Sequence, residues 1–227
     1  GRGASDGDAA TGRIDGQVLV AHQAGHRDRC TAISDVREPW RIEIDALPRK
    51  RHALVLEGDP SFFDADRAAA DVQKIVVAAK GVMGAYIYPH YHFLNMVTES
   101  GGGLEHKNSF LGMSGRFTTR TRRSYMGWLS LIAHEYFHNW NVKRLRPIEL
   151  GPFDYETENY VKMLWVAEGF TDYYADVLVK RAALSSRDEY LDALSNQIEA
   201  VQSTPGRQVT PVNMASYDTW IKQYRPD

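Results

Sequence analysis

The sequence predicts an α+β fold in which mixed strands come first and helices follow. Two observations predict this class. Up to about residue 98, short apolar runs bounded by turn residues are typical of strands, with one alanine-rich helix among them. From Tyr125 onward, apolar residues recur at steps of three and four, which is typical of helices. The chain contains no internal repeat and no low-complexity tract.

In the first half, the pattern predicts short strands separated by turn residues. These strands are residues 18–20, 41–44, 52–57, 85–88 and 91–98. Residues 1–16 are polar and glycine-rich, which favours a loop or tail. Asp64 stands at the N-cap position of the alanine-rich helix, which we expect to run to Lys80 and to stop at Gly81. The glycines at 101–103 leave room for another chain to come close to the backbone.

In the second half, three helices are predicted. The first passes through residues 125–138 and ends before Pro147, after a basic run that includes Lys143, Arg144 and Arg146. Cations there are typical of a helix C-terminus, where they oppose the helix dipole. The second helix covers about 160–184. The third runs from Ser186 to about 203, and Ser186 with Glu189 forms a capping box at its start.

Composition excludes several classes of protein. The 227 residues carry 27 Lys+Arg and 29 Asp+Glu, a net charge of −2, which excludes binding to nucleic acid through bulk charge. With 43% hydrophobic and 25% charged residues, the chain is typical of a soluble globular protein. No apolar run reaches the ~18 residues that a membrane-spanning helix needs. A single cysteine, Cys30, excludes an internal disulfide. The compartment, cytoplasm or periplasm, and the oligomeric state both stay open.

The clearest chemical motif is H-E-x-x-H at residues 134–138. On a helix, His134 and His138 lie one turn apart on the same face, so both imidazoles can bind one zinc ion. Glu135 is rotated by about 100° from His134, where it can take a proton from a water on the metal. The ordinary alternative is an amphipathic helix with two solvent-facing histidines.

The next predicted helix supplies a third ligand. Glu168 lies in an otherwise apolar run, where binding a cation would offset the cost of an unpaired carboxylate. Asp172 lies four residues later on the same face, and could accept the other N–H of a ligand histidine. The ordinary alternatives are an exposed carboxylate on the polar stripe of the helix for Glu168, and a surface charge for Asp172.

Three motifs together resemble the glycyl aminopeptidase family of zinc metallopeptidases, which usually carry a PDZ domain near the C-terminus. The motifs are residues 101–106 (GGGLEH), 134–144 (HEYFHNWNVKR) and 164–171 (LWVAEGFT). Family-like sequence joins them from about 54 to 227. The resemblance implies a thermolysin-like (gluzincin) catalytic domain over 53–227, truncated at its C-terminus, with residues 1–52 as a partial N-terminal β region or tail. We therefore expect the chain to be an excerpt of a longer polypeptide.

The resemblance also implies a mechanism. It gives one zinc ion held by His134, His138 and Glu168, with Glu135 as general base and then general acid. By similarity to related aminopeptidases, a strand with Gly102 and Gly103 would lie along the peptide. Glu105 would bind the free α-amino group of the substrate. The ordinary alternative for Glu105 is a polar loop end.

These inferences predict a zinc aminopeptidase that removes small N-terminal residues, glycine and alanine, from peptides. Two alternatives stay open: a zinc endopeptidase, and a non-catalytic module that binds peptides at a metal-site fold. In related aminopeptidases a tyrosine well after the third ligand stabilises the tetrahedral intermediate. We expect it beyond the Tyr-Arg-Pro-Asp phrase at 224–227, so this excerpt is expected to be weakly active or inactive.

Overall fold

The computed structural model describes strand residues 13–14, 17–24, 27–33 and 40–47, and residues 50–154 and 156–223. Side chains are described for Ile42, Ile44 and from Arg51 onward, within the same limits. Of the predicted loop at 1–16, only strand residues 13–14 fall in these ranges. Residues 224–227 lie outside them. Among the described residues, none of the helices combines the length and the apolar character that crossing a bilayer requires.

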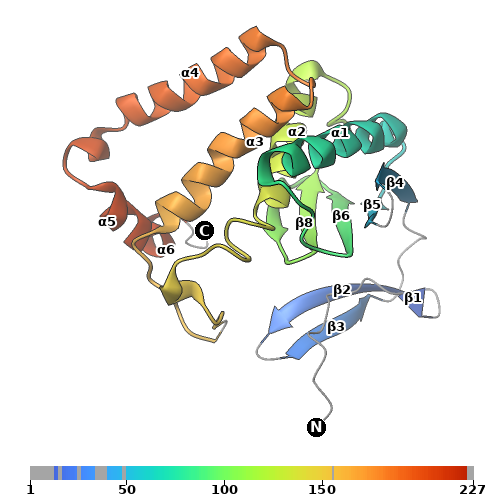
Figure 1. Cartoon of the computed structure of the whole chain (residues 1–227), viewed down its shortest axis with the longest axis horizontal. Helices are drawn as coiled ribbons and strands as arrows, with labels where there is room; N and C mark the ends of the chain where they lie inside the picture. The colour runs from blue at the N-terminus through green and yellow to red at the C-terminus, as the bar shows by residue number, and fades with distance from the viewer. Residues whose placement is uncertain are drawn as a thin grey trace.

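Two sheets come first in the chain (Figure 1). The first is antiparallel and contains β1 (Arg13–Ile14), β2 (Gln17–Ala24) and β3 (Arg27–Ile33) in that order. The second contains β4 (Trp40–Leu47), β5 (Lys50–Gly58), β6 (His90–Val97), β7 (Gly102–Glu105) and β8 (Ser109–Ser114), in the order β4-β5-β6-β8-β7. Strands β5, β6 and β8 are parallel, while β4 and β7 pair antiparallel at the two ends.

Helices cover one face of the second sheet (Figure 1). They are α1 (Ala65–Met83) and α2 (Arg122–Phe137), and α3 (Phe170–Arg181) packs against α2. The remaining elements are η1 (Ile148–Leu150), the π-helical turn η2 (Trp165–Gly169), α4 (Arg187–Ser203), η3 (Pro205–Gln208), α5 (Val212–Tyr217) and α6 (Thr219–Lys222). The core lies between the sheet and these helices, where Leu54, Phe93, Leu129 and Ile132 are fully buried. The predicted α+β class, with strands first and helices after, is confirmed.

Local signals set several boundaries as predicted. The Asp64 side chain accepts from the backbone N–H of Arg67 at the start of α1. Helix α4 begins at the predicted capping box, since both hydrogen bonds between Ser186 and Glu189 are present. The end of α1 was predicted wrongly, because the helix continues past Gly81 and stops at Gly84, which has φ +81°. Glycine adopts this left-handed conformation without a steric penalty, so Gly84 ends the helix.

Three other predictions need correction. Residues 85–88 form no strand, because Tyr88 is buried at 2% exposure and bonds His52 and Tyr136 from a loop. The helix with the H-E-x-x-H motif ends at Phe137, well before Pro147. The predicted helix 160–184 is regular only over α3, which the π-helical turn η2 precedes. Strand β5 runs through residue 52. The boundary between the predicted domains 1–52 and 53–227 stays a prediction.

Candidate metal centre

The two histidines of the motif lie together at the C-terminal end of α2. His134 is in the last turn and His138 is the C-cap residue. The spacing of four residues places both rings on one face, with Nε2 of His134 3.0 Å from Nε2 of His138. Both side chains are largely buried, at 18% and 2% exposure. The helix therefore presents two nitrogen atoms to one point.

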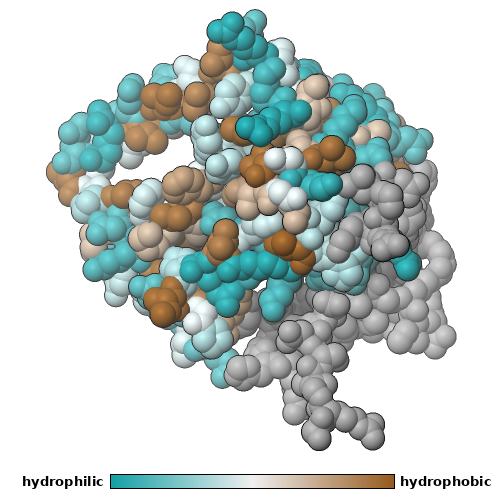
Figure 2. Space-filling model, in the orientation of Figure 1, coloured by the Kyte–Doolittle hydropathy of each residue, from teal (hydrophilic) through white to brown (hydrophobic). Residues whose placement is uncertain are grey.

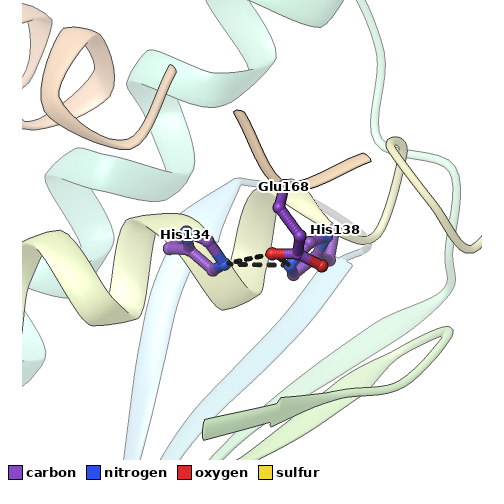
Figure 3. A group of neighbouring side chains, drawn as sticks. All are labelled: His134, His138 and Glu168. Carbon is purple, nitrogen blue, oxygen red and sulfur yellow. Dashed lines mark hydrogen bonds and ion pairs between the residues drawn. The ribbon is translucent and has the colours of Figure 1, made fainter. Parts of the chain in front are cut away.

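Glu168 comes to the same point from the next helical segment (Figure 3). Its Oε2 lies 3.2 Å from Nε2 of His134 and 3.4 Å from Nε2 of His138. Glu168 belongs to the π-helical turn η2, an irregularity that frequently occurs at functional sites. Since the structure brings these three side chains together, the arrangement required by the predicted ligand set is present.

The outer nitrogen atoms of both rings have acceptors. Nδ1 of His134 lies 2.8 Å from Oδ1 of Asp172, and Nδ1 of His138 lies 2.7 Å from the backbone oxygen of Asn141. Because a carboxylate and a carbonyl only accept, each Nδ1 carries the hydrogen. In the neutral form of each ring, Nε2 then carries a lone pair, and this lone pair faces Glu168. Asp172 lies where the sequence predicted it.

The dimensions of this group fit zinc. A tetrahedral ion with bonds of ~2.0–2.1 Å holds its ligand atoms ~3.3–3.4 Å apart. The three separations here are 3.0, 3.2 and 3.4 Å. Two imidazole nitrogens and one carboxylate oxygen are also the donor set typical of catalytic zinc, which leaves a fourth position open. Among the described residues, two groups of three side chains could hold a metal ion, and His134, His138 and Glu168 form the one with two histidines.

Hydrogen bonds within this group shift the pKa values of its members. Burial lowers the pKa of His134, but hydrogen bonds to Asp172 and Glu168 outweigh it and raise that pKa to about 10. Burial raises the pKa of Glu168, and the hydrogen bonds from the two histidines outweigh it and lower that pKa to about 2. Side chains whose pKa values are shifted this far, in a largely buried site, are suited to binding a cation, which would replace the histidine proton.

Asn141 is a supporting residue that the sequence analysis missed. Its side-chain amide donates to the carbonyl oxygens of Val166 and Ala167, at 3.1 and 3.0 Å, and to Oγ1 of Thr171 at 3.1 Å. Its backbone oxygen accepts from His138. Asn141 therefore ties the π-helical turn that carries Glu168 to the ligand His138. The residue lies in the second resembling motif, but its contacts depend on the turn that follows α2.

Glu135 lies beside the metal group and is 5% exposed. Burial raises the pKa of Glu135 to about 7, and the two histidines oppose this effect. Its Oε2 is buried without a hydrogen-bond partner. Oε1 lies so close to β7 that a Cβ added at Gly103 would be 2.5 Å from it. A buried carboxylate with an unused oxygen is placed to take up a proton.

Known proteins are similar to this chain over the residues of the metal centre. A family model, M61 glycyl aminopeptidase, matches residues 127–227, which include the group at the metal centre. The crystal structure of an aminopeptidase N family protein from Idiomarina loihiensis is similar, with 32% sequence identity and a TM-score of 0.78. The match covers 82% of this chain and 33% of that chain, so this chain spans about a third of its length. No curated protein matches the chain. Residues 127–227 of the chain are therefore similar to the glycyl aminopeptidase family.

The predicted resemblance to this family is confirmed, and the remaining residues of the predicted site lie on β7. Gly102, with φ +117°, and Gly103 are on this strand, which is at one end of the sheet order. Glu105 ends the strand. Carboxylate oxygens of Glu105 and Glu135 and a ring nitrogen of His138 lie within 4.8 Å of one another. The structure thus gathers the predicted substrate-binding strand and the metal group on one side of α2.

Lys143 is the main difference between expectation and structure in this region. The sequence predicts that this cation opposes the dipole at the end of the helix that carries the H-E-x-x-H motif, but the Lys143 side chain is 6% exposed and its Nζ lies 3.1 Å from Oε1 of Glu105. The helix ends before Lys143, so the side chain is free to turn inward. Burial raises the pKa of Glu105, while Lys143 and His138 outweigh burial and lower it. Glu105 is thus an ionised carboxylate that already has a partner.

Proposed function

We propose that this chain forms the catalytic part of a zinc-dependent aminopeptidase that removes small N-terminal residues, glycine and alanine, from peptides. One observation carries the proposal: three ligand atoms lie at zinc-like separations, and beside them lies the carboxylate of Glu135, whose Oε2 has no hydrogen-bond partner. Similarity to the glycyl aminopeptidase family over residues 127–227 supports the exopeptidase action and the preference for glycine. When bound, zinc would supply Lewis-acid chemistry that polarises the peptide carbonyl and acidifies water.

In the proposed mechanism, the residues of this chain have separate tasks. His134, His138 and Glu168 hold the metal, and Asp172 orients His134 through Nδ1. Glu135 accepts a proton from the attacking water through its carboxylate, and then donates that proton to the nitrogen of the leaving group. A pKa of about 7 suits both steps, because the carboxyl group then gains and loses a proton readily near neutral pH.

Substrate binding is proposed for the β7 edge. Strand β7 pairs with β8 along one side, so an extended peptide could add along its other side through backbone hydrogen bonds. Glu105, at the end of β7, would accept from the free α-ammonium group of that peptide. Holding the ammonium group fixes which peptide bond reaches the metal, and so selects for cleavage of the first residue.

The exopeptidase claim is tested with matched substrates. A glycyl peptide and its N-acetylated twin are incubated with the full chain at saturating zinc. We expect cleavage of the free peptide only, because acetylation removes the charge that Glu105 would bind. Equal cleavage of both would support the endopeptidase alternative, in which Glu105 binds Lys143 and no substrate group. Peptide binding without any cleavage would support the non-catalytic alternative.

The assignment of Glu135 is tested by Glu135→Gln. We expect this variant to keep one zinc ion per chain and to lose hydrolysis, because the amide preserves the shape of the side chain and cannot accept the proton. Metal content is measured by elemental analysis. Glu168→Ala should instead lose the metal. Glu199→Gln, at an exposed position of α4, is the matched control and should change neither. Full activity in Glu135→Gln would refute the general-base assignment.

A further inference from the structure

We propose that Lys143 is a positioning residue for substrate binding. It holds one oxygen of Glu105, so that the carboxylate stays at the free-amine end of the site with its other oxygen turned to the substrate. The inference rests on the proposed function, because Lys143 would place Glu105, the group that is proposed to bind the α-ammonium group.

The position of Lys143 is set by the same turn that holds a proposed metal ligand. Its backbone N–H donates to the carbonyl oxygen of His138 at 3.0 Å, just after α2 ends. Its Nζ reaches Oε1 of Glu105 at 3.1 Å and lies 4.9 Å from the centre of the Phe153 ring. An ammonium group between a carboxylate and an aromatic face is held on two sides. Lys143 therefore links the end of α2 to the end of β7.

The exposed fractions of the two side chains indicate that Lys143 positions Glu105 and does not compete with the substrate for it. The Lys143 side chain is 6% exposed, whereas that of Glu105 is 20% exposed. Moving a buried ammonium group away from its partner is strongly unfavourable, so a substrate would not readily displace Lys143. The substrate can still approach Glu105 from the exposed side. One carboxylate accepts several hydrogen bonds, so Lys143 and a substrate ammonium group can share it.

The neighbouring charges explain why Glu105 needs such an anchor. Glu105 and Glu135 offer oxygens within 4.8 Å of the same histidine nitrogen, and two carboxylates this close repel each other. Without a cation on its far side, the Glu105 side chain would move toward solvent, away from the end of the peptide. Among the described residues, Lys143 forms the ion pair with Glu105.

The inference is tested by binding rather than turnover. The dissociation constants of a glycyl tripeptide and of its N-acetylated twin are measured by calorimetry on the zinc-loaded full chain, in the Glu135→Gln background. Lys143→Met should weaken binding of the free peptide on the order of tenfold, equivalent to one charge-assisted hydrogen bond, and leave the acetylated twin unchanged. Lys143→Arg should restore most of the affinity. Lys107→Met removes an exposed lysine two residues from Glu105, and should have no effect.

A double-mutant cycle separates positioning from a merely structural role. In the Glu105→Gln background, Lys143→Met should have no further effect, because the group that Lys143 positions is gone. Additive losses, or equal losses for both peptides, would overturn the inference, as would tighter binding of the free peptide by Lys143→Met. Lys143→Gln, which keeps a hydrogen-bond donor, serves if the methionine variant unfolds. If the unsubstituted chain binds both twins equally, the exopeptidase proposal fails, whatever Lys143 does.

Discussion

Helices α2 and α4 have nearly the same length, 16 and 17 residues, but opposite surroundings. Eight residues of α2 are buried, whereas α4 has no buried residue. Figure 2 shows an opening between α4 and α3, and apolar side chains at the surface along α4. Leu191, Ile198 and Val201 of α4 are exposed. Packing between the sheet and α3 thus surrounds α2, while α4 keeps its shape through local signals such as its capping box.

The comparison shows why the candidate site is on α2. Ligand atoms must be held within a few tenths of an ångström, and the buried residues of α2 provide that rigidity. Helix α4 contributes no ligand, and a segment with little buried surface opens more easily. The two helices therefore differ in what a substitution should cost.

The largest difference is expected for leucine truncation. Leu129 on α2 is fully buried, and Leu129→Ala should lower the free energy of unfolding by ~2–5 kcal/mol through the cavity it leaves. Leu191 on α4 is 44% exposed, so the same truncation there should change it by less than ~1 kcal/mol. Urea unfolding followed by circular dichroism measures both. Equal losses would mean that α4 is packed in solution against a surface that this chain provides.

The next effect concerns the space around Glu135, where α2 meets β7. Gly103→Ala places a Cβ 2.5 Å from Oε1 of Glu135, so the carboxylate or the strand must move. Overpacking of this kind costs ~1–3 kcal/mol, and we expect peptide hydrolysis to fall about 10–100-fold. Gly101→Ala is the matched control, because nothing lies within 4 Å of its added Cβ. Unchanged hydrolysis in Gly103→Ala would show that Glu135 does not need its present position.

The same contrast explains how much could be predicted from the sequence. Helical periodicity alone places His134 and His138 on one face, and the local caps of α1 and α4 follow from single residues such as Asp64 and Ser186. Glu168 was predicted because a carboxylate in an apolar run is conspicuous. These inferences need only short-range geometry, which sequence patterns encode well.

The remainder depends on contacts between distant segments. The approach of Gly103 to Glu135 spans 32 residues between β7 and α2, and no local pattern encodes it. Lys143 was assigned to the end of a helix because that helix was predicted to continue past Phe137, and its contact with Glu105 was missed. Asn141 is recognisable only once the π-helical turn has carbonyl groups for it to bind. Residue chemistry was therefore predictable, and the scaffold that orients it was not.

The smallest effect concerns the link between the two helices. Arg122, the first residue of α2, donates from Nε and Nη2 to the two oxygens of Glu189 on α4, at 2.7 and 2.9 Å. This hydrogen bonding, together with the backbone N–H of Ser186, lowers the pKa of Glu189 to about 2. A lowered pKa means that the link stabilises the fold above about pH 4.5 and is lost as the pH falls toward 2. Hydrogen exchange of the α4 amides measures it.

Because Glu189 is exposed, the link should contribute little to global stability, and its effect should be confined to α4. Glu189→Gln should speed exchange of the α4 amides at pH 7, and the difference from the unsubstituted chain should vanish toward pH 2, where both side chains are uncharged. The amides of α2 should not respond, since buried residues hold that helix from Tyr125 to Phe137. Asp192→Asn, which removes another exposed carboxylate from α4, is the control for net charge. A Glu189→Gln effect that persists at pH 2, or spreads to α2, would mean that α4 is held by packing, and the contrast between the two helices would then fail.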